Sequence, residues 1–374
     1  MHILFAGGGT AGHINPALAV AGYIKQCHKD AKISYIGTEK GLESRLVREC
    51  GYDFYAIEVA GFQRQISLEN IKKNASAVVK MFTSSVEARK LLLKLKPDVV
   101  VGTGGYVSGP VLREAAKLKI KTCIHEQNAF PGVTTKALAP MVDEVMLAFS
   151  EAKKHLKLKK EPIITGNPVR TNVLEANRSV ARKALGIGEQ PVILSFGGSL
   201  GAKPINDAVA GLIKWHVDSE KYFHIHATGK RGYEDMKNTL KTLGVNADKY
   251  NKLQIREYID DMDTCLAAAD IVICRSGAIT LSEIQNCGKP AILIPSPYVA
   301  ENHQFHNAMA LKKVGAAEVI EEKNLSSESL ISAVSSMIDN EALLDEMSKR
   351  AKKSAICDSN ERIYEVIMRL FTVA

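Results

Sequence analysis

The feature that most constrains the fold is a glycine turn that occurs once in each half of this 374-residue chain. The segments ILFAGGGTAGHINPALAV and VILSFGGSLGAKPINDAV both place Gly-Gly-(Thr/Ser)-x-Gly after an apolar run and before a helical pattern, so that 8–12 corresponds to 197–201. Such a turn lets the backbone approach a ligand at the carboxyl end of a strand and offers it a helix N-terminus. Two of them in equivalent places predict two similar Rossmann-like domains that face one another across a cleft.

Short apolar runs alternate with amphipathic helical patterns along the whole chain, which predicts an α/β fold with parallel sheets built from βαβ units. Strands are expected in the first half at residues 2–6, 32–37, 54–59, 98–102, 121–125 and 144–149. In the second half they are expected at 191–196, 222–228, 253–258, 271–274, 291–295 and 317–320. A charged stretch at 153–162 leads to the breakers Gly166 and Pro168, so we expect the domain boundary near Gly166.

Composition restricts the class of protein. No apolar run approaches the ~18 residues of a transmembrane helix, and no basic region precedes the first apolar run, so we expect neither a span nor a signal peptide and place the chain in the cytoplasm. The seven cysteines form no C-x-x-C pair and are expected to be free, buried thiols. The net charge of +8 indicates an anionic partner, which could be nucleic acid, a lipid surface or a phosphorylated substrate.

The first glycine turn allows more than one interpretation. Gly7, Gly9 and Gly12 satisfy the G-x-G-x-x-G spacing of dinucleotide-binding folds, but the acid that such folds need at the end of the second strand is missing. Glu39, the nearest acid, comes later than the expected ~20 residues, which disfavours NAD or FAD. Glycines that only permit close packing remain an alternative. A third glycine turn at 102–110 also follows an apolar strand, and three such turns are more than packing usually requires.

The segment AADIVICRSGAITLSEIQNCGKPAILIPSP, residues 268–297, is the most informative stretch for a ligand. A strand ends before Arg275, a helix begins at Ala278 or the residue after it, and Glu283 lies one to two turns in. A helix N-terminus with an adjacent arginine suits a diphosphate, and a carboxylate deeper on that helix can accept both hydroxyls of a ribose. This pattern predicts a nucleoside diphosphate site. The alternative is a Gly277 that serves helix packing beside a surface Arg275–Glu283 ion pair.

Several histidine and aspartate motifs are candidates for catalytic or metal-binding groups. His13 is expected in the first turn of a helix, pointing into the cleft, where an imidazole can accept a proton from a substrate hydroxyl or serve as a structural hydrogen-bonding group. Asp261 and Asp263 form a D-x-D motif, but they lie at a helix start and are interpreted as helix caps. The pairs in HIH (224–226) and HQFH (303–306) lack a carboxylate or cysteine set nearby, so no metal site is expected.

The segment 64–82 interleaves basic and apolar side chains, among them Lys72, Lys73, Val79 and Phe82. Apolar residues at helical spacing are usually core and the lysines beside them a solvated rim. The same layout suits a helix that lies against an anionic membrane surface.

Six motifs in order, GGGTAGHINPALA, GTGGYVSGPV, HEQNAFPG, GNPVR, FGGSLGA and CRSGAITLSEI, together resemble the MurG family of glucosaminyltransferases over almost the whole chain. The resemblance implies the GT-B fold, in which a last helix, here at 360–370, returns to the first domain. It implies an N-terminal acceptor and membrane-associating domain over 1–165 with about 359–374, and a C-terminal UDP-GlcNAc-binding domain over 166–358.

The resemblance also implies the reaction. N-acetylglucosamine would pass from UDP-GlcNAc to the 4-hydroxyl of the muramoyl sugar of undecaprenyl-diphospho-muramoylpentapeptide, with inversion, which converts lipid I to lipid II in peptidoglycan synthesis. It implies no cofactor, no metal and no nucleic-acid partner. It favours the membrane interpretation of 64–82, with Lys72, Lys73, Val79 and Phe82 docking the enzyme peripherally on the anionic cytoplasmic face of the cell membrane.

Site residues follow from the same motifs. His13 would be the catalytic base, and Gly104, Gly105 and Tyr106 would hold the acceptor. The positions implied to bind the donor are Thr10, Ala11, Gly12, Asn128, Arg170, Ser199, Ile259, Arg275, Ala278, Ile279, Thr280, Glu283 and Gln304. Two other functions stay open: a UDP-GlcNAc 2-epimerase, which would need acid/base carboxylates and no lipid-docking surface, and a catalytically idle nucleotide-sugar binding protein.

Overall fold

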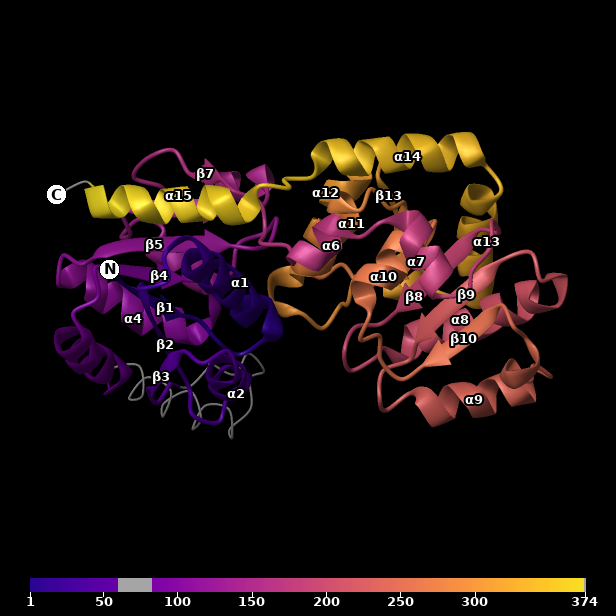
Figure 1. The fold of residues 1–374 in the computed structure, drawn as a ribbon, viewed down its shortest axis with the longest axis horizontal. Coiled ribbons are helices and arrows are strands. Elements are labelled where there is room, and N and C mark those ends of the chain that lie inside the picture. Colours follow the sequence, from indigo (N-terminus) through magenta and orange to yellow (C-terminus); the bar gives the residue numbers. More distant parts are fainter. Residues whose placement is uncertain (60–82, 373–374) are drawn as a thin grey trace. The chain divides into compact units, whose positions relative to one another are not determined.

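A computed structural model describes residues 1–59 and 83–372 of the chain (Figure 1). The chain divides into two compact units. Unit 1 comprises Met1–Pro168 with Asp358–Ala374, and unit 2 comprises Val169–Cys357. Each unit contains one parallel sheet with helices on its faces, and each is described by itself below.

The described strands of unit 1 form a parallel sheet in the order β3-β2-β1-β4-β5-β6-β7. Their bounds are β1 His2–Ala6, β2 Lys32–Gly37, β3 Asp53–Ala56, β4 Val99–Gly102, β5 Lys121–Glu126, β6 Glu144–Leu147 and β7 Ile163–Ile164. The first six confirm the strands expected from apolar runs. The two-residue strand β7 was not expected, because it exists only through its pairing with β6 at the sheet edge.

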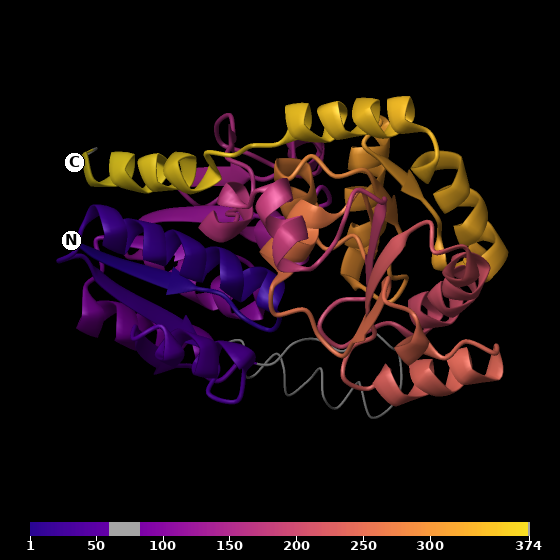
Figure 2. The same cartoon turned by 45° about the vertical axis from the view of Figure 1, so that its right-hand side comes forward.

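Helices cover both faces of this sheet. The described helices are α1 Ala11–Cys27, α2 Leu42–Glu49, α4 Gly105–Lys117, α5 Val133–Leu138, the 3₁₀ helix η1 Ser150–His155 and α15 Ser359–Thr372, and residues 83–95 are also helical. The helices α1 and α15 pack side by side on one face (Figure 2), where Ile24 and Ile367 join the core under Ile3 of β1. The prediction that the last helix returns to the first domain is therefore confirmed.

The described strands of unit 2 form a parallel sheet in the order β10-β9-β8-β11-β12-β13. Their bounds are β8 Val192–Phe196, β9 Phe223–Ala227, β10 Leu253–Arg256, β11 Ile271–Cys274, β12 Ala291–Leu293 and β13 Ala317–Val319, and all six were expected. The helices are α6 Thr171–Glu175, α7 Arg178–Ala184, α8 Lys203–His216, α9 Tyr233–Thr242, α10 Met262–Ala268, α11 Ala278–Asn286, α12 His303–Lys313, α13 Ser327–Ile338 and α14 Glu341–Ser354. Short 3₁₀ helices are η2 Val217–Ser219, η3 Ala247–Lys249, η4 Ala300–Asn302 and η5 Glu322–Asn324.

The two units repeat one topology around their first strands. β1 lies between β2 and β4, and β8 lies between β9 and β11, so the strand order reverses beside the strand that carries each glycine turn. Ligands of open α/β sheets bind at such reversals. Gly9 (φ 90°) and Gly198 (φ 97°) take the same left-handed conformation at equivalent positions. The two turns then diverge, because Gly12 already lies inside α1 whereas Gly201 precedes α8 with φ 76°.

The composition led to expectations about the cysteines and about membrane-spanning helices. All seven cysteines are free, as predicted. Burial was predicted for all of them, but it holds for Cys123, Cys265 and Cys274, is partial for Cys287, and is wrong for the exposed Cys27, Cys50 and Cys357. Among the described helices, none combines the length and the apolar character that crossing a bilayer requires.

Candidate functional site

The glycine turns of unit 1 meet at one edge of its sheet. β1, β4 and β5 are neighbours and run parallel, so the segments that follow them, 7–10, 103–104 and 127–132, lie at the same edge. Predicted residues from three motifs are thereby brought together within this unit.

His13 lies in the first turn of α1 and is half-buried. Its Nδ1 is 3.0 Å from the carbonyl oxygen of Gly8, and the hydroxyl of Thr10 is 3.4 Å from the same nitrogen. A carbonyl only accepts hydrogen bonds, so Nδ1 carries the proton and donates it to Gly8. In the neutral form of the ring, Nε2 then has the free lone pair that a general base needs.

The turn after β4 fits closely around this histidine. Gly104 (φ 100°) and Gly105 (φ 74°) both have left-handed backbones that favour glycine. A Cβ on Gly104 would lie 3.1 Å from Nε2 of His13, and one on Gly105 would lie 2.2 Å from the carbonyl oxygen of Gly8. Both glycines are therefore needed for the geometry of His13.

The packing interpretation of the first turn holds for some of its glycines and not for others. A Cβ on Gly7 would lie 2.3 Å from Oγ1 of Thr103, so close packing requires glycine there. A Cβ on Gly12 would come no nearer to a described atom than 3.6 Å, at Oγ1 of Thr10. Packing therefore does not explain Gly12.

A buried carboxylate that the sequence analysis missed lies under the first turn. Glu43, on α2, is fully buried and accepts hydrogen bonds from the backbone N–H of Thr38 (3.0 Å), its hydroxyl (2.7 Å) and the N–H of Gly9 (3.4 Å). Glu39, the nearest acid to the end of the second strand in the sequence, is exposed and pairs with Arg48 instead. The only sequence signal for this buried acid was the pair of glycines at 37 and 41. In the structure both lie against Glu43, and a Cβ on either would collide with its side chain.

Tyr106, the second residue of α4, lies over the same turn and is 38% exposed. A Cβ on Gly9 would lie 3.1 Å from its ring. Burial raises the pKa of the Tyr106 hydroxyl, and the carboxylate of Glu43 raises it further. This phenol is therefore a neutral hydrogen-bonding group at physiological pH.

The predicted donor residues of unit 1 lie at the same edge. Thr10 occupies the N-cap position of α1 without a capping bond from its side chain, and Ala11 and Gly12 are exposed at the helix start. Asn128 follows β5, and its backbone N–H and Nδ2 both donate to Oε1 of Glu126, at 3.0 and 3.1 Å.

Predicted donor residues of unit 2 lie beyond the carboxyl ends of its strands. Ser199 is exposed in the turn after β8, and Ile259 is buried after β10. Gln304 lies in the first turn of α12, and its Oε1 accepts a hydrogen bond from the N–H of Ser296 at 2.9 Å.

Glu283 and Arg170 form a partly buried ion pair. Arg170 precedes α6, and its Nε and Nη2 donate to Oε1 of Glu283 at 3.0 and 2.9 Å. Oε2 of Glu283 accepts no hydrogen bond from any described residue. Burial raises the pKa of the Glu283 carboxyl, and the guanidinium of Arg170 opposes this rise. The second oxygen is therefore available to a ligand.

The helix α11 begins at Ala278 as predicted, and Ile279 and Thr280 complete its first turn. The packing alternative for Gly277 is wrong, because a Cβ there would meet no described atom closer than Oγ1 of Thr280 at 3.9 Å. The positive end of the helix dipole at such an N-terminus favours an anion.

The surface pair Arg275–Glu283 that served as the alternative interpretation does not form. Arg275 is largely buried, forms an ion pair with Glu322 of η5 and donates to the carbonyl of Ile294 at 3.1 Å. Sequence reasoning missed Glu322 because it lies 47 residues further along the chain.

Two further interpretations are tested by the side chains. Asp261 occupies the N-cap position of α10, but its carboxylate accepts from Arg256 at 2.7 Å and caps no backbone N–H, so the capping role of its side chain is wrong. His224 and His226 are buried and each lies 2.8 Å from the hydroxyl of Ser195. Within the described residues, no three histidine, cysteine or acidic side chains gather closely enough to hold a metal ion.

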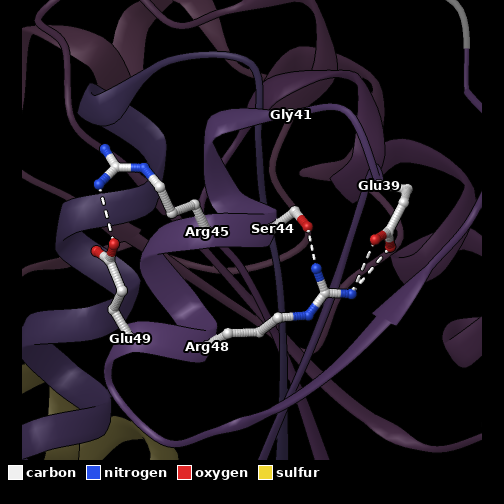
Figure 3. Close-up of a pocket in the computed structure, with 6 residues that line it drawn as sticks. All are labelled: Glu39, Gly41, Ser44, Arg45, Arg48 and Glu49. Carbon is white, nitrogen blue, oxygen red and sulfur yellow. Dashed lines mark hydrogen bonds and ion pairs between the residues drawn. The ribbon is translucent and has the colours of Figure 1, made fainter.

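A pocket of about 540 Å³ lies on α2 of unit 1 (Figure 3). It is lined by Glu39, Gly41, Ser44, Arg45, Arg48 and Glu49. The charged side chains around the pocket form ion pairs with one another, Arg45 with Glu49 and Arg48 with Glu39. No predicted site residue lines this pocket. The predicted docking residues Lys72, Lys73, Val79 and Phe82 lie outside the described part of the chain.

Comparisons with known proteins place both units in one family. Residues 3–147 match the glycosyltransferase family 28 N-terminal domain, and residues 192–363 match the glycosyltransferase family 28 C-terminal domain. A protein of Acetivibrio thermocellus is 48% identical over 98% of this chain and 97% of its own length. One of Ruminiclostridium cellulolyticum is 45% identical over 99% of this chain and 100% of its own. Both are named UDP-N-acetylglucosamine–N-acetylmuramyl-(pentapeptide) pyrophosphoryl-undecaprenol N-acetylglucosamine transferase.

Solved structures show the same fold. The crystal structure of Acinetobacter baumannii MurG superimposes with a TM-score of 0.79 at 29% identity, covering 98% of this chain and 99% of that one. The crystal structure of a putative UDP-N-acetylglucosamine 2-epimerase from Listeria monocytogenes superimposes with a TM-score of 0.70 over 100% of this chain and 97% of that one. At 16% identity the second likeness shows the fold alone.

Proposed function

The chain belongs to glycosyltransferase family 28 and has the GT-B fold, and from this premise we propose how its residues divide the reaction between the two units. The enzyme is an N-acetylglucosamine transferase that uses UDP-N-acetylglucosamine and the pyrophosphoryl-undecaprenol-linked N-acetylmuramyl-pentapeptide, and it converts lipid I to lipid II. Residues 1–165 with 359–374 act on the acceptor, and 166–358 bind the donor.

His13 is the catalytic base of this proposal. Its Nε2 takes the proton of the acceptor 4-hydroxyl while the hydroxyl oxygen attacks C1 of N-acetylglucosamine and UDP leaves, so a single displacement inverts C1. The observation that carries the assignment is the 3.0 Å hydrogen bond from Nδ1 of His13 to the carbonyl oxygen of Gly8. This bond keeps the ring proton on Nδ1, so that Nε2 can accept the proton of the acceptor hydroxyl. General base catalysis of this kind contributes roughly 10²–10⁴-fold to the rate. Gly104, Gly105 and Tyr106 hold the acceptor beside it.

The donor nucleotide is assigned to the carboxyl edge of the unit 2 sheet. Oε2 of Glu283 accepts both ribose hydroxyls, and the bonds from Arg170 to Oε1 orient the carboxylate. The diphosphate lies before the N-terminus of α11, at Ala278, Ile279 and Thr280, where the helix dipole favours an anion. Arg275, held in place by Glu322, helps to stabilise the charge that develops on UDP.

Further donor contacts complete the proposal. Ser199 and Ile259 line the donor site, and Gln304 contacts the donor sugar. Thr10, Ala11, Gly12 and Asn128 are the donor-binding positions of unit 1 in this proposal. The reaction as proposed uses neither a metal nor another cofactor, and no nucleic acid takes part.

Peripheral attachment to the cytoplasmic face of the cell membrane is part of the proposal. The net charge of +8 supports attraction to anionic lipid. The helical residues 83–95, which follow the predicted docking residues, expose Val86 (55%) and Leu93 (54%) beside Arg89 and Lys90. This mixture of apolar and basic side chains suits a lipid surface.

One assay tests the proposed roles together. The purified protein is incubated with radiolabelled UDP-N-acetylglucosamine and a lipid I analogue, and label is sought in lipid. We expect label in lipid from the unaltered enzyme and a labelling rate lower by roughly 10²–10⁴-fold from His13→Ala, with UDP affinity unchanged. Label in N-acetylmannosamine without acceptor would instead indicate epimerase activity. Turnover of His13→Ala equal to that of the unaltered enzyme would remove His13 from the mechanism.

A further inference from the structure

The peptide group between Gly8 and Gly9 is bound at both of its ends. Its carbonyl oxygen accepts the Nδ1–H of His13 at 3.0 Å, and its N–H donates to Oε2 of Glu43 at 3.4 Å. These four residues therefore form one chain in which a single planar amide joins a carboxylate to an imidazole. No described side chain binds Nδ1 of His13 as a carboxylate would in a catalytic triad.

The surroundings hold this amide in one orientation. Gly9 has φ 90°, which turns its N–H toward α2. A Cβ on Gly8 would lie 2.6 Å from Oε1 of Glu43, and one on Gly105 would lie 2.2 Å from the carbonyl oxygen of Gly8. The amide thus fits between the carboxylate on one side and the turn after β4 on the other, with no room for a side chain.

The carboxylate is itself fixed. Two donors of Thr38, its backbone N–H and its hydroxyl, converge on Oε1 of Glu43, which leaves Oε2 for Gly9. Glu43 is fully buried and forms no ion pair with a described residue, so its charge acts on its hydrogen-bonding partners with little screening by water. A carboxylate that accepts a hydrogen bond from the N–H of a peptide group polarises that group. The carbonyl oxygen of the same peptide group thereby becomes a stronger hydrogen-bond acceptor.

We propose that Glu43 is a positioning residue that acts on His13 through the Gly8–Gly9 peptide group. It keeps the proton of the imidazole on Nδ1, stabilises the imidazolium that forms when Nε2 takes the acceptor proton, and holds the ring toward the acceptor. This is the task that a carboxylate performs by direct contact in a Ser-His-Asp triad. The catalytic part of the inference rests on the proposed role of His13, whereas the coupling of Glu43 to the His13 tautomer does not.

The geometry selects Glu43→Gln as the test variant. Because two donors of Thr38 hold the position of Oε1, the amide oxygen of glutamine takes that position and its NH₂ group replaces Oε2, where it faces the N–H of Gly9. The Thr38 bonds survive and the link to the peptide is lost. Glu39→Gln is the matched control, since it removes the same charge four residues earlier from an exposed side chain.

Two measurements test the proposal. Nitrogen-15 NMR of the free protein, above the pH at which the ring protonates, reports which His13 nitrogen carries the proton. We expect the Nδ1–H form in the unaltered protein and in Glu39→Gln, and a substantial Nε2–H fraction in Glu43→Gln. In the lipid I assay, we expect kcat of Glu43→Gln to fall about 10–100-fold, the loss typical when the hydrogen-bonding partner of a metal-ligating histidine is removed, with little change in KM.

A double variant separates action through His13 from a general structural role. If Glu43 acts through the imidazole, Glu43→Gln adds nothing to the loss already caused by His13→Ala. Independent, additive losses would overturn the proposal, and so would an unchanged tautomer in folded Glu43→Gln. If Glu43→Gln does not fold, Glu43→Asp serves instead: it keeps the charge but withdraws the carboxylate from Gly9, and an unchanged tautomer and kcat in that variant would equally refute the coupling.

The failures are distinguishable. Full turnover by His13→Ala removes the base assigned above, while the tautomer measurement still decides whether Glu43 and His13 are coupled. Loss of turnover in His13→Ala with unaltered turnover and tautomer in Glu43→Gln leaves the base in place and removes Glu43.

Discussion

Gly105→Ala tests the link between the turn after β4 and catalysis, because the structure supplies a matched control for its backbone strain. Gly105 has φ 74°, and a Cβ there would lie 2.2 Å from the carbonyl oxygen of Gly8. Gly51, which follows α2, has φ 75°, and a Cβ there would meet no described atom within 4 Å. The two alanine variants therefore share the left-handed strain, and only Gly105→Ala adds a collision.

The magnitudes follow from these distances. A side chain in the left-handed region costs roughly 1–2 kcal/mol, and the stiffer unfolded chain returns roughly 0.4–1 kcal/mol, so Gly51→Ala should lose about 1 kcal/mol of unfolding free energy. In Gly105→Ala the Gly8 oxygen must also move by about 1 Å to reach ordinary contact distance, and overpacking of this kind adds roughly 1–3 kcal/mol. Because that oxygen orients His13, and a 1 Å misplacement can cost 10²-fold, kcat should fall about 100-fold.

The assay combines urea unfolding with transfer of label to a lipid I analogue. We expect Gly51→Ala to be slightly less stable with an unaltered kcat, and Gly105→Ala to be less stable still and slow. The affinity for UDP should stay the same in both variants, because both glycines belong to unit 1 whereas the nucleotide is assigned to unit 2. A Gly105→Ala enzyme as fast as Gly51→Ala would refute the argument that this turn sets the position of His13.

Three more outcomes are expected. Glu283→Ala should weaken UDP binding by about 1–3 kcal/mol, or roughly 5–150-fold in a calorimetric Kd, because it strands Arg170 and the ribose hydroxyls; unchanged binding would reject the ribose assignment. Burial lowers the pKa of His216 to about 4 and that of His226 to about 3. Below about pH 6.5 these two imidazoles therefore take up protons in the unfolded chain before they do so in the folded state. The unfolding free energy should therefore fall below about pH 6.5, by up to roughly 1.4 kcal/mol per pH unit for each of these imidazoles, and a urea midpoint that is flat from pH 7 to 5 would contradict this. The protein should sediment with anionic vesicles more than with zwitterionic ones, and equal sedimentation would reject the anionic docking surface.

Local pattern was enough to predict most of the architecture. Apolar runs of strand length between amphipathic helices predicted twelve strands, and each forms where expected, because burial in a parallel sheet leaves a continuous apolar signature. Strand β7 was not predicted, because a strand of two residues is too short to leave a recognisable apolar run in the sequence. The helix start at Ala278 was equally local, since a glycine before an apolar-periodic segment marks it.

The sequence by itself determined the two glycine-turn units, the family, and the chemistry that each motif could offer. The tertiary structure alone decided which side chains meet: Glu283 binds Arg170 rather than Arg275, Arg275 binds Glu322, and Glu43 reaches the peptide that holds His13. The physical reason is distance along the chain. A helix or strand is set by neighbours a few residues apart, whereas these contacts join residues 34–113 positions apart, which only the packing of helices on the sheets brings together.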